Sequence, residues 1–260
     1  MLKKLLKYDL RSVIPFLCIF YVLALVCAGL SRLFLLFDHV MIWNIIGQIF
    51  SGAAVSMMFS IFINTAMRSW VLFRQNLYGD PSYLTHTLPV RKTAIYLSKA
   101  LTGLIGMALS FGVIGVTLVI QYYGTPFWKQ IYAMAKMFSQ GYPVLVMGLL
   151  LGILFLQMIN VLQCGFAGLL LGHKRNQRKI VWSVLAGLGV YAVGQILMLA
   201  VIGVIALFSQ DFMNLFTTAQ MVCVEDVWSF LTVSGILEIG LIAGCYFFNV
   251  KLFNRGVNVD

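Results

Sequence analysis

Six long stretches without charge constrain this chain more than any other feature of its sequence. Residues 13–31, 40–67, 100–128, 137–172 and 180–210 contain no Lys, Arg, Asp or Glu, and residues 227–250 contain only Glu238. A helix of roughly 20 apolar residues crosses a bilayer core about 30 Å thick, so each stretch is long enough to span it. Barrel strands would instead alternate in hydrophobicity over about ten residues. The pattern therefore predicts an all-α integral membrane protein with six transmembrane helices, at about residues 13–36, 40–67, 97–123, 143–171, 180–208 and 228–250.

The composition agrees with this prediction. Hydrophobic residues make up 61% of the chain and charged residues 10%, whereas soluble domains contain about 25% charged residues. With nearly everything assigned to the bilayer, residues 1–260 are expected to form a single transmembrane domain. The net charge of +10 is then expected in loops that face the cytoplasm and anionic lipid, and nucleic acid is not an expected partner.

The basic residues indicate the orientation of the chain. Of the 18 Lys and Arg residues, 15 lie in the two termini and in two of the gaps between spans, at positions 3–11, 68–99, 174–179 and 251–255. The exceptions are Arg32, Lys129 and Lys136. Lysine and arginine are enriched on the cytoplasmic side of membrane proteins. Both termini and the gaps after the second and fourth spans are therefore predicted to be cytoplasmic.

The first twelve residues have an amphipathic pattern. Leucines recur there at helical spacing and basic residues occupy another face (Leu2, Leu5, Leu6 and Leu10; Lys3, Lys7 and Arg11). This favours an interfacial helix in the inner headgroup layer before Pro15 and the first span. The alternative is an ordinary basic flank of a transmembrane helix.

The inner gap at residues 68–96 is unusually rich in apolar and aromatic residues. Residues 68–77 can continue the second helix past the membrane surface. Asp80 and Pro81 suit the start of a short helix, and Pro89 suits its end. Such a loop is expected to pack on lipid, on its own helices or on a partner. The outer gaps at 124–142 and 209–227 are long enough for short interfacial or re-entrant helices.

Polar residues inside the spans are candidates for function. Glu238 lies ten residues beyond Trp228, so about 15 Å below that interface. One interpretation is that Glu238 binds a proton or a cation or lines a substrate path. The other is that its carboxyl is hydrogen-bonded to a neighbouring helix. Gln157, Asn160 and Gln163 share one face of the fourth span, where amides bind another helix or line a wet cavity.

Small residues are spaced for close helix contact in three places. Pairs of glycines four residues apart occur at positions 148 and 152, 168 and 172, and 240 and 244. This spacing permits close approach of helix backbones. With 23 glycines in the chain, chance matches are also expected.

Several catalytic patterns are missing from the sequence. It contains no Gly-x-x-x-x-Gly-Lys-Ser/Thr phosphate loop, no His-Glu-x-x-His and no Gly-x-Ser-x-Gly. The chain is therefore not expected to be an enzyme or to hold a metal or cofactor.

The inner loop resembles that of a known family. Leu77-Tyr78-Gly79, Tyr83-Leu84-Thr85 and Leu88-Pro89-Val90, followed by Lys92 and Lys99, are similar to the loop before the third span of ABC-2 type permeases of Gram-positive bacteria. That family shares the basic amphipathic start, the six spans and the cytoplasmic termini. The chain departs from the usual pattern at Pro81, Ser82 and His86.

The resemblance implies that this chain is the permease subunit of an exporter in the bacterial plasma membrane. The inner loop would be the coupling helix that docks a separate ATP-binding subunit, which carries ATP and Mg²⁺. A second permease, in a homodimer or heterodimer, would complete the path, and short outward helices before the sixth span would cap it. The implied docking residues are Arg74, Leu77, Tyr78, Asp80, Tyr83, Leu84 and Leu88.

The cargo is expected to be hydrophobic or amphipathic, such as a peptide, a lipid or an antibiotic, because the spans carry few charges. The alternative is an ion-coupled secondary transporter or channel that uses Glu238. A third alternative is a partner subunit that transports nothing.

Overall fold

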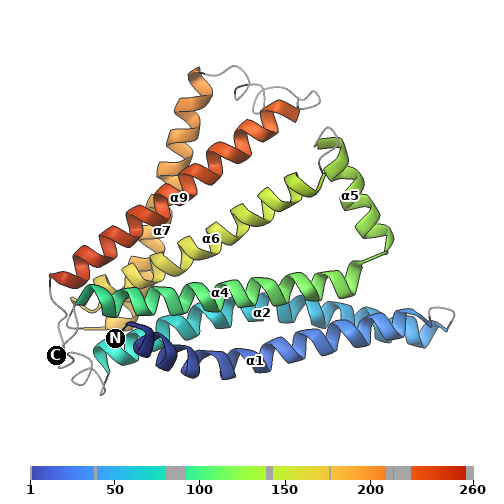
Figure 1. The fold of residues 1–260 in the computed structure, drawn as a ribbon, viewed down its shortest axis with the longest axis horizontal. Coiled ribbons are helices and arrows are strands. Elements are labelled where there is room, and N and C mark those ends of the chain that lie inside the picture. The colour runs from blue at the N-terminus through green and yellow to red at the C-terminus, as the bar shows by residue number, and fades with distance from the viewer. Residues whose placement is uncertain are drawn as a thin grey trace. The chain divides into compact units, whose positions relative to one another are not determined.

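The computed structural model describes residues 2–37, 40–79, 92–138, 143–175, 177–208, 213 and 224–255. Within these residues all regular structure is helical, and no strand occurs. The helices are α1 (Leu2–Leu35), α2 (Met41–Tyr78), α4 (Lys92–Tyr122), α5 (Pro126–Phe138), α6 (Pro143–Gly172), α7 (Lys179–Phe208) and α9 (Val224–Asn254) (Figure 1).

Six of the described helices are long and apolar enough to cross a bilayer, and α5, with 13 residues, is the exception. Each corresponds to one predicted span, but α1 begins at Leu2 rather than at about residue 13, and α2 ends at Tyr78 rather than at about residue 67. The other ends lie within about five residues of the prediction. The prediction of an all-α, multi-pass membrane protein is therefore confirmed at this level. The predicted coupling helix lies mostly in residues 80–91 and the predicted outward helices in 209–227, which are largely outside the described residues.

Two predictions about helix ends can be compared with the structure. α2 continues without a break to Tyr78, as residues 68–77 predict. The predicted interfacial segment is not a separate helix, because α1 runs continuously from Leu2 through Pro15 to Leu35. Proline lacks an amide hydrogen and commonly bends a helix, and α1 is bowed along its length in Figure 1.

The chain divides into two compact units at Trp128–Lys129, inside α5. The first unit contains α1, α2 and α4, each of which packs against the other two. Its core includes Val13, Leu17 and Leu72, with Tyr21 against them. A polar layer crosses this core: the Ser110 hydroxyl lies 2.8 Å from the Tyr21 hydroxyl and 2.7 Å from the Thr65 hydroxyl. That the whole chain forms one permease domain stays a prediction.

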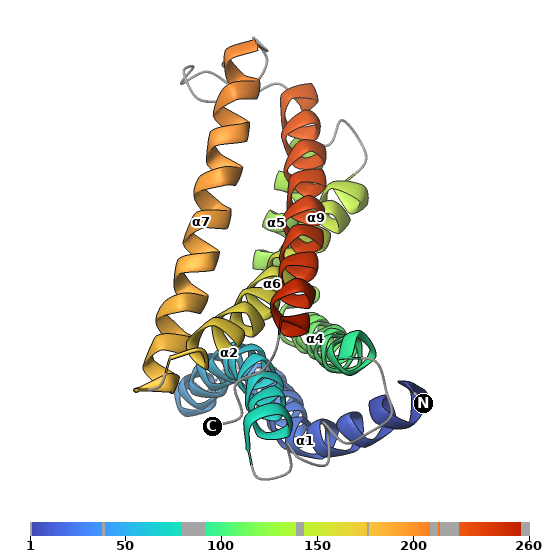
Figure 2. The ribbon, with the colours of Figure 1, turned by 90° about the vertical axis from the view of Figure 1, so that its left-hand side faces the viewer.

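In the second unit, α6 packs against both α7 and α9. α6 and α7 lie closest near the turn that joins them and spread toward their other ends (Figures 1 and 2). At the close end the backbones of α6 and α7 nearly touch: a Cβ atom on Gly168 would lie 2.6 Å from the Gly187 Cα. The motif at Gly168 and Gly172 is therefore a true helix contact.

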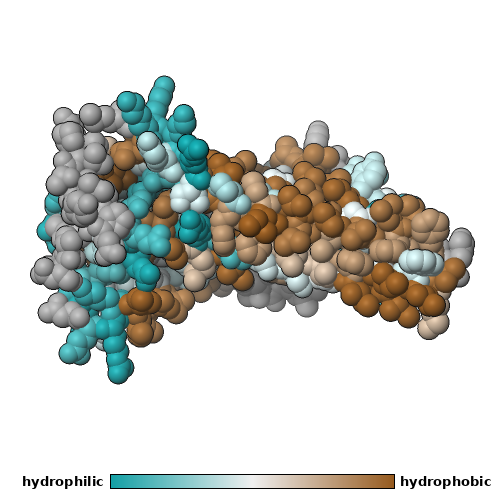
Figure 3. Space-filling model, turned by 90° about the horizontal axis from the view of Figure 1, so that it is seen from below, coloured by the Kyte–Doolittle hydropathy of each residue, from teal (hydrophilic) through white to brown (hydrophobic). Residues whose placement is uncertain are grey.

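Large apolar side chains are exposed along the helices. On α7, Ile196 is 65% exposed and Leu199 is 68% exposed. On the face seen in Figure 3, apolar residues cover most of the helix length, and hydrophilic ones gather at the end where the chain begins. Soluble proteins rarely expose apolar surface on this scale, so the pattern fits helices surrounded by lipid.

Candidate functional site

The ends of the inner loop are fixed by buried contacts. α2 ends at Tyr78 and α4 begins at Lys92, so the loop joins these two helices. On the two helices, close to where the loop leaves and rejoins them, the rings of Phe73 on α2 and Tyr96 on α4 meet edge to face. Their centroids are 6.1 Å apart and the interplanar angle is 87°. Both side chains are fully buried. The contact therefore holds the two ends of the loop at a fixed separation.

Only part of the predicted docking set can be placed. Arg74 and Tyr78 are half-buried in the last turns of α2, and Leu77 is fully buried in the packing of the first unit. Asp80, Tyr83, Leu84 and Leu88 lie outside the described residues. The docking role of all seven stays a prediction.

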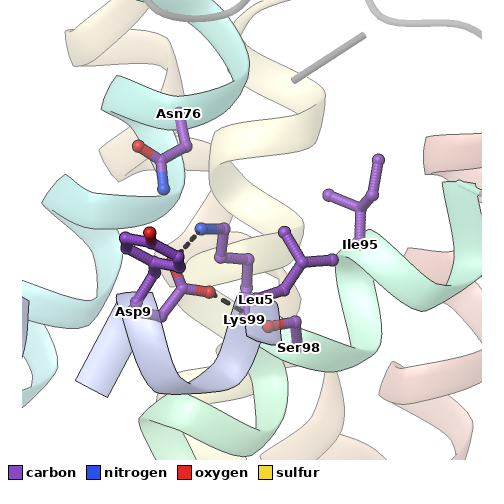
Figure 4. Close-up of a pocket in the computed structure, with 7 residues that line it drawn as sticks. Leu5, Asp9, Asn76, Ile95, Ser98 and Lys99 are labelled. Carbon is purple, nitrogen blue, oxygen red and sulfur yellow. Dashed lines mark hydrogen bonds and ion pairs between the residues drawn. The ribbon is translucent and has the colours of Figure 1, made fainter. Parts of the chain in front are cut away.

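The first turns of α1 pack beside these loop ends. Their basic residues (Lys3, Lys4, Lys7 and Arg11) are exposed. Asp9 points the other way and is only 5% exposed. Its Oδ1 accepts a hydrogen bond from the Lys99 Nζ at 2.5 Å and its Oδ2 accepts one from the Ser98 hydroxyl at 3.0 Å (Figure 4). The start of α1 is thus bonded to the start of α4.

A small cavity of about 180 Å³ opens at this place, which we call the loop root; it is lined by Leu5, Tyr8, Asp9, Asn76, Ile95, Ser98 and Lys99. These residues come from α1, α2 and α4, and the Asn76 side chain faces the ion pair in Figure 4. The lining carries one carboxylate and one ammonium, so its net charge is zero. The loop root is therefore suited to joining three helices rather than to binding a free ion.

A second set of contacts joins α1 to α2 one turn further on. Arg68 donates from Nη2 to the Ser12 backbone carbonyl and to the Ser12 hydroxyl, each at 3.2 Å. Its guanidinium also lies 5.5 Å from the centre of the Phe16 ring, a cation–π distance. The start of α1 is consequently held by polar contacts to both other helices of the unit.

Asp9, Ser98 and Lys99 are not among the site residues that the sequence predicts. The sequence places Lys99 among the cytoplasmic charges and in the motif that resembles the permease loop, and it predicts no role for Asp9. One signal was available: Asp9 is the only acidic residue in residues 1–37, and it occupies the leucine face four residues after Leu5. A lone carboxyl on the buried face of a basic helix indicates a cation on a neighbouring element. The identity of that cation depends on tertiary packing.

The amides and the carboxyl predicted in the spans meet in the second unit. Glu238 on α9 is 1% exposed. Its Oε1 accepts a hydrogen bond from the Asn160 Nδ2 on α6 at 2.9 Å. The Gln157 amide satisfies all its neighbours when its nitrogen faces the carboxyl: Nε2 then lies 2.6 Å from the Glu238 Oε1, and the amide oxygen accepts from the Tyr191 hydroxyl at 2.7 Å and from the Gln195 Nε2 at 3.0 Å. The five side chains (Gln157, Asn160, Tyr191, Gln195 and Glu238) form a polar cluster that joins all three helices.

The third predicted amide lies apart from this cluster. Asn249 donates from Nδ2 to the Gln163 backbone carbonyl at 3.0 Å and to the Gln163 Oε1 at 3.4 Å. Both residues are buried. Gln163 therefore bonds α6 to α9 at a second level, three turns of α9 from Glu238.

The chemistry of the polar cluster is that of a satisfied buried carboxyl. Amide donors face Glu238, and its side chain has almost no exposed surface. Within the described parts of the chain, no group of three His, Cys, Asp or Glu residues is placed to hold a metal ion. This geometry fits the second interpretation of Glu238, a carboxyl bonded to a neighbouring helix.

No family model, curated protein or solved structure matches this chain. The resemblance to ABC-2 type permeases therefore depends on the loop motif and the layout of spans.

Proposed function

We propose that this chain is the permease subunit of an ATP-driven exporter of the ABC-2 type, in the plasma membrane of a bacterium with both termini cytoplasmic. It would pair with a second permease and dock a separate ATP-binding subunit through the inner loop. The observation that carries the proposal is the loop root, together with the Phe73–Tyr96 contact. Both ends of the loop are fixed by buried contacts to the helices, so a force on the loop would move α1, α2 and α4.

This arrangement provides a route from ATP hydrolysis to transport. The chain lacks a phosphate loop, so the energy would enter through the docked subunit. Closure of two ATP-binding subunits would shift the two loops and change the balance between inward-open and outward-open states. ATP can act only through its different affinity for those states. The scarcity of charged residues in the spans favours a hydrophobic or amphipathic cargo, such as a peptide, a lipid or an antibiotic.

The proposal is tested by changing the loop in the full chain. The double variant Tyr83→Ala/Leu84→Ala, expressed with an ATP-binding subunit that co-purifies with the wild-type chain, should insert into the membrane normally but lose co-purification with that subunit. The matched control is Tyr132→Ala/Leu188→Ala, because both side chains are exposed outside the loop. Normal co-purification of the loop variant, or an inner loop labelled from outside intact cells, would refute the proposal.

The second candidate function is ion-coupled transport through Glu238. It is favoured by one observation, the burial of a carboxyl within a candidate span, since such groups are often functional. Transport that continues without any ATP-binding subunit and is abolished by Glu238→Gln would support it. Transport that needs the subunit and survives Glu238→Gln would support the exporter.

A further inference from the structure

The ion pair at the loop root joins segments that are 90 residues apart in sequence. Asp9 lies in the first turns of α1, and Lys99 lies seven residues after the start of α4. Both side chains are more than nine-tenths buried. Ser98 donates to the second carboxylate oxygen, so the Asp9 carboxylate has a bonding partner at each oxygen. The contact therefore specifies both the distance and the rotation of α1 relative to α4.

The surroundings make this pair selective for one arrangement. Leu5 and Ile95 are apolar, and Asn76 and Ser98 are neutral. Apolar contacts alone tolerate a small slide or rotation of one helix on another. A buried charge that loses its partner is strongly unfavourable, and the best-attested role of such pairs is to fix register.

The position of the pair connects it with the loop. α4 starts where the loop ends, and Lys99 is about two turns into that helix. We propose that Asp9 and Lys99 are positioning residues: their ion pair keeps the first turns of α1 in register with the start of α4, so that the starts of these two helices move as one body. The register of α1 on α4 does not depend on the proposed function. Only the claim that a docked ATP-binding subunit drives the common movement rests on it.

The pairing itself is tested on the full chain alone in lipid nanodiscs. Hydrogen exchange of the amides in residues 5–13 is measured for wild type, Asp9→Asn, Lys99→Met and the double variant. Each single change should raise exchange on the order of tenfold, because it leaves one buried group unpaired. The factor by which the double variant raises the exchange rate should be far smaller than the product of the two single-variant factors, because the free-energy effects of coupled residues are not additive. Additive effects would overturn the proposal.

The controls remove a lysine charge at exposed positions on the same two helices. Lys7→Met lies on the same turns of α1 as Asp9, and Lys92→Met lies at the start of α4; both lysines are exposed. Their exchange should match wild type. Exchange in the Asp9→Asn and Lys99→Met variants that is no faster than in these controls would also overturn the proposal.

The role in movement needs a second measurement. With the ATP-binding subunit bound, Asp9→Asn and Lys99→Met should lower the permease-stimulated kcat for ATP several-fold and leave its KM unchanged. An unchanged kcat in variants whose exchange is raised would refute the positioning role. If wild type binds no ATP-binding subunit, the proposed function fails, while hydrogen exchange still decides whether Asp9 and Lys99 fix α1 on α4.

Discussion

Replacement of Gly168 by alanine should destabilise the second unit. The added Cβ atom would lie 2.6 Å from both the Cα and the N of Gly187. Carbon atoms in contact normally lie about 3.5–4.0 Å apart, so α6 and α7 would have to separate by about 1 Å. The obstructing atoms belong to the backbone, so no side-chain rotation can relieve the overlap.

The magnitude follows from two opposing effects. Overpacking in a tight contact costs about 1–3 kcal/mol, and the rigid backbone neighbours place this site at the upper end. Alanine is also a better helix former than glycine by about 1 kcal/mol. The net loss in the free energy of unfolding should be about 2 kcal/mol. Gly172→Ala would overlap the Ser183 backbone in the same way, and the double variant should lose less than the sum because one displacement relieves both contacts.

The same helix offers a control with the opposite sign. A Cβ atom on Gly148 or Gly152 would meet nothing within 4 Å, so alanine there should add up to about 1 kcal/mol through helix propensity alone. The assay is thermal unfolding of the purified chain in one detergent, followed by tryptophan fluorescence. A difference of about 3 kcal/mol should separate Gly168→Ala from Gly148→Ala by about 6–12 °C. Equal unfolding temperatures for these two variants would refute the reasoning.

Three further changes test other contacts by the same thermal assay. Glu238→Leu should lower the free energy of unfolding by about 2–4 kcal/mol, because the side-chain amides of Asn160 and Gln157 lose their acceptor. Stability equal to wild type would show that the polar cluster does not join the helices. Ser110→Ala should cost about 1–2 kcal/mol through its two hydroxyl contacts, whereas Ser56→Ala, whose hydroxyl bonds only its own helix at 2.9 Å, should change little; equal losses would contradict this. Arg32→Met should change stability by less than about 0.5 kcal/mol, because its hydrogen bond to a backbone carbonyl is exposed; a larger loss would mean that the contact is shielded.

The spans could be predicted from the sequence because the cause is local. A helix must satisfy its own backbone in lipid, so an uncharged stretch of sufficient length is informative by itself. The sequence predicts that the amides on one face of α6 bind another helix or line a wet cavity. It does not show that α9 supplies the partner, Glu238. The choice among three glycine motifs and the pairing of Asp9 with Lys99 depend on how helices pack. Hydropathy contains no information about that packing.

The length of α2 has a consequence for the membrane in which this chain can work. Its 38 residues extend about 57 Å, against a hydrocarbon core of about 30 Å. The first part of the helix is uncharged as far as Met67, about 40 Å of chain that can tilt within the lipid. Such a helix adapts to hydrophobic mismatch by changing its inclination rather than by stretching. The chain should therefore tolerate bilayers of different acyl-chain length.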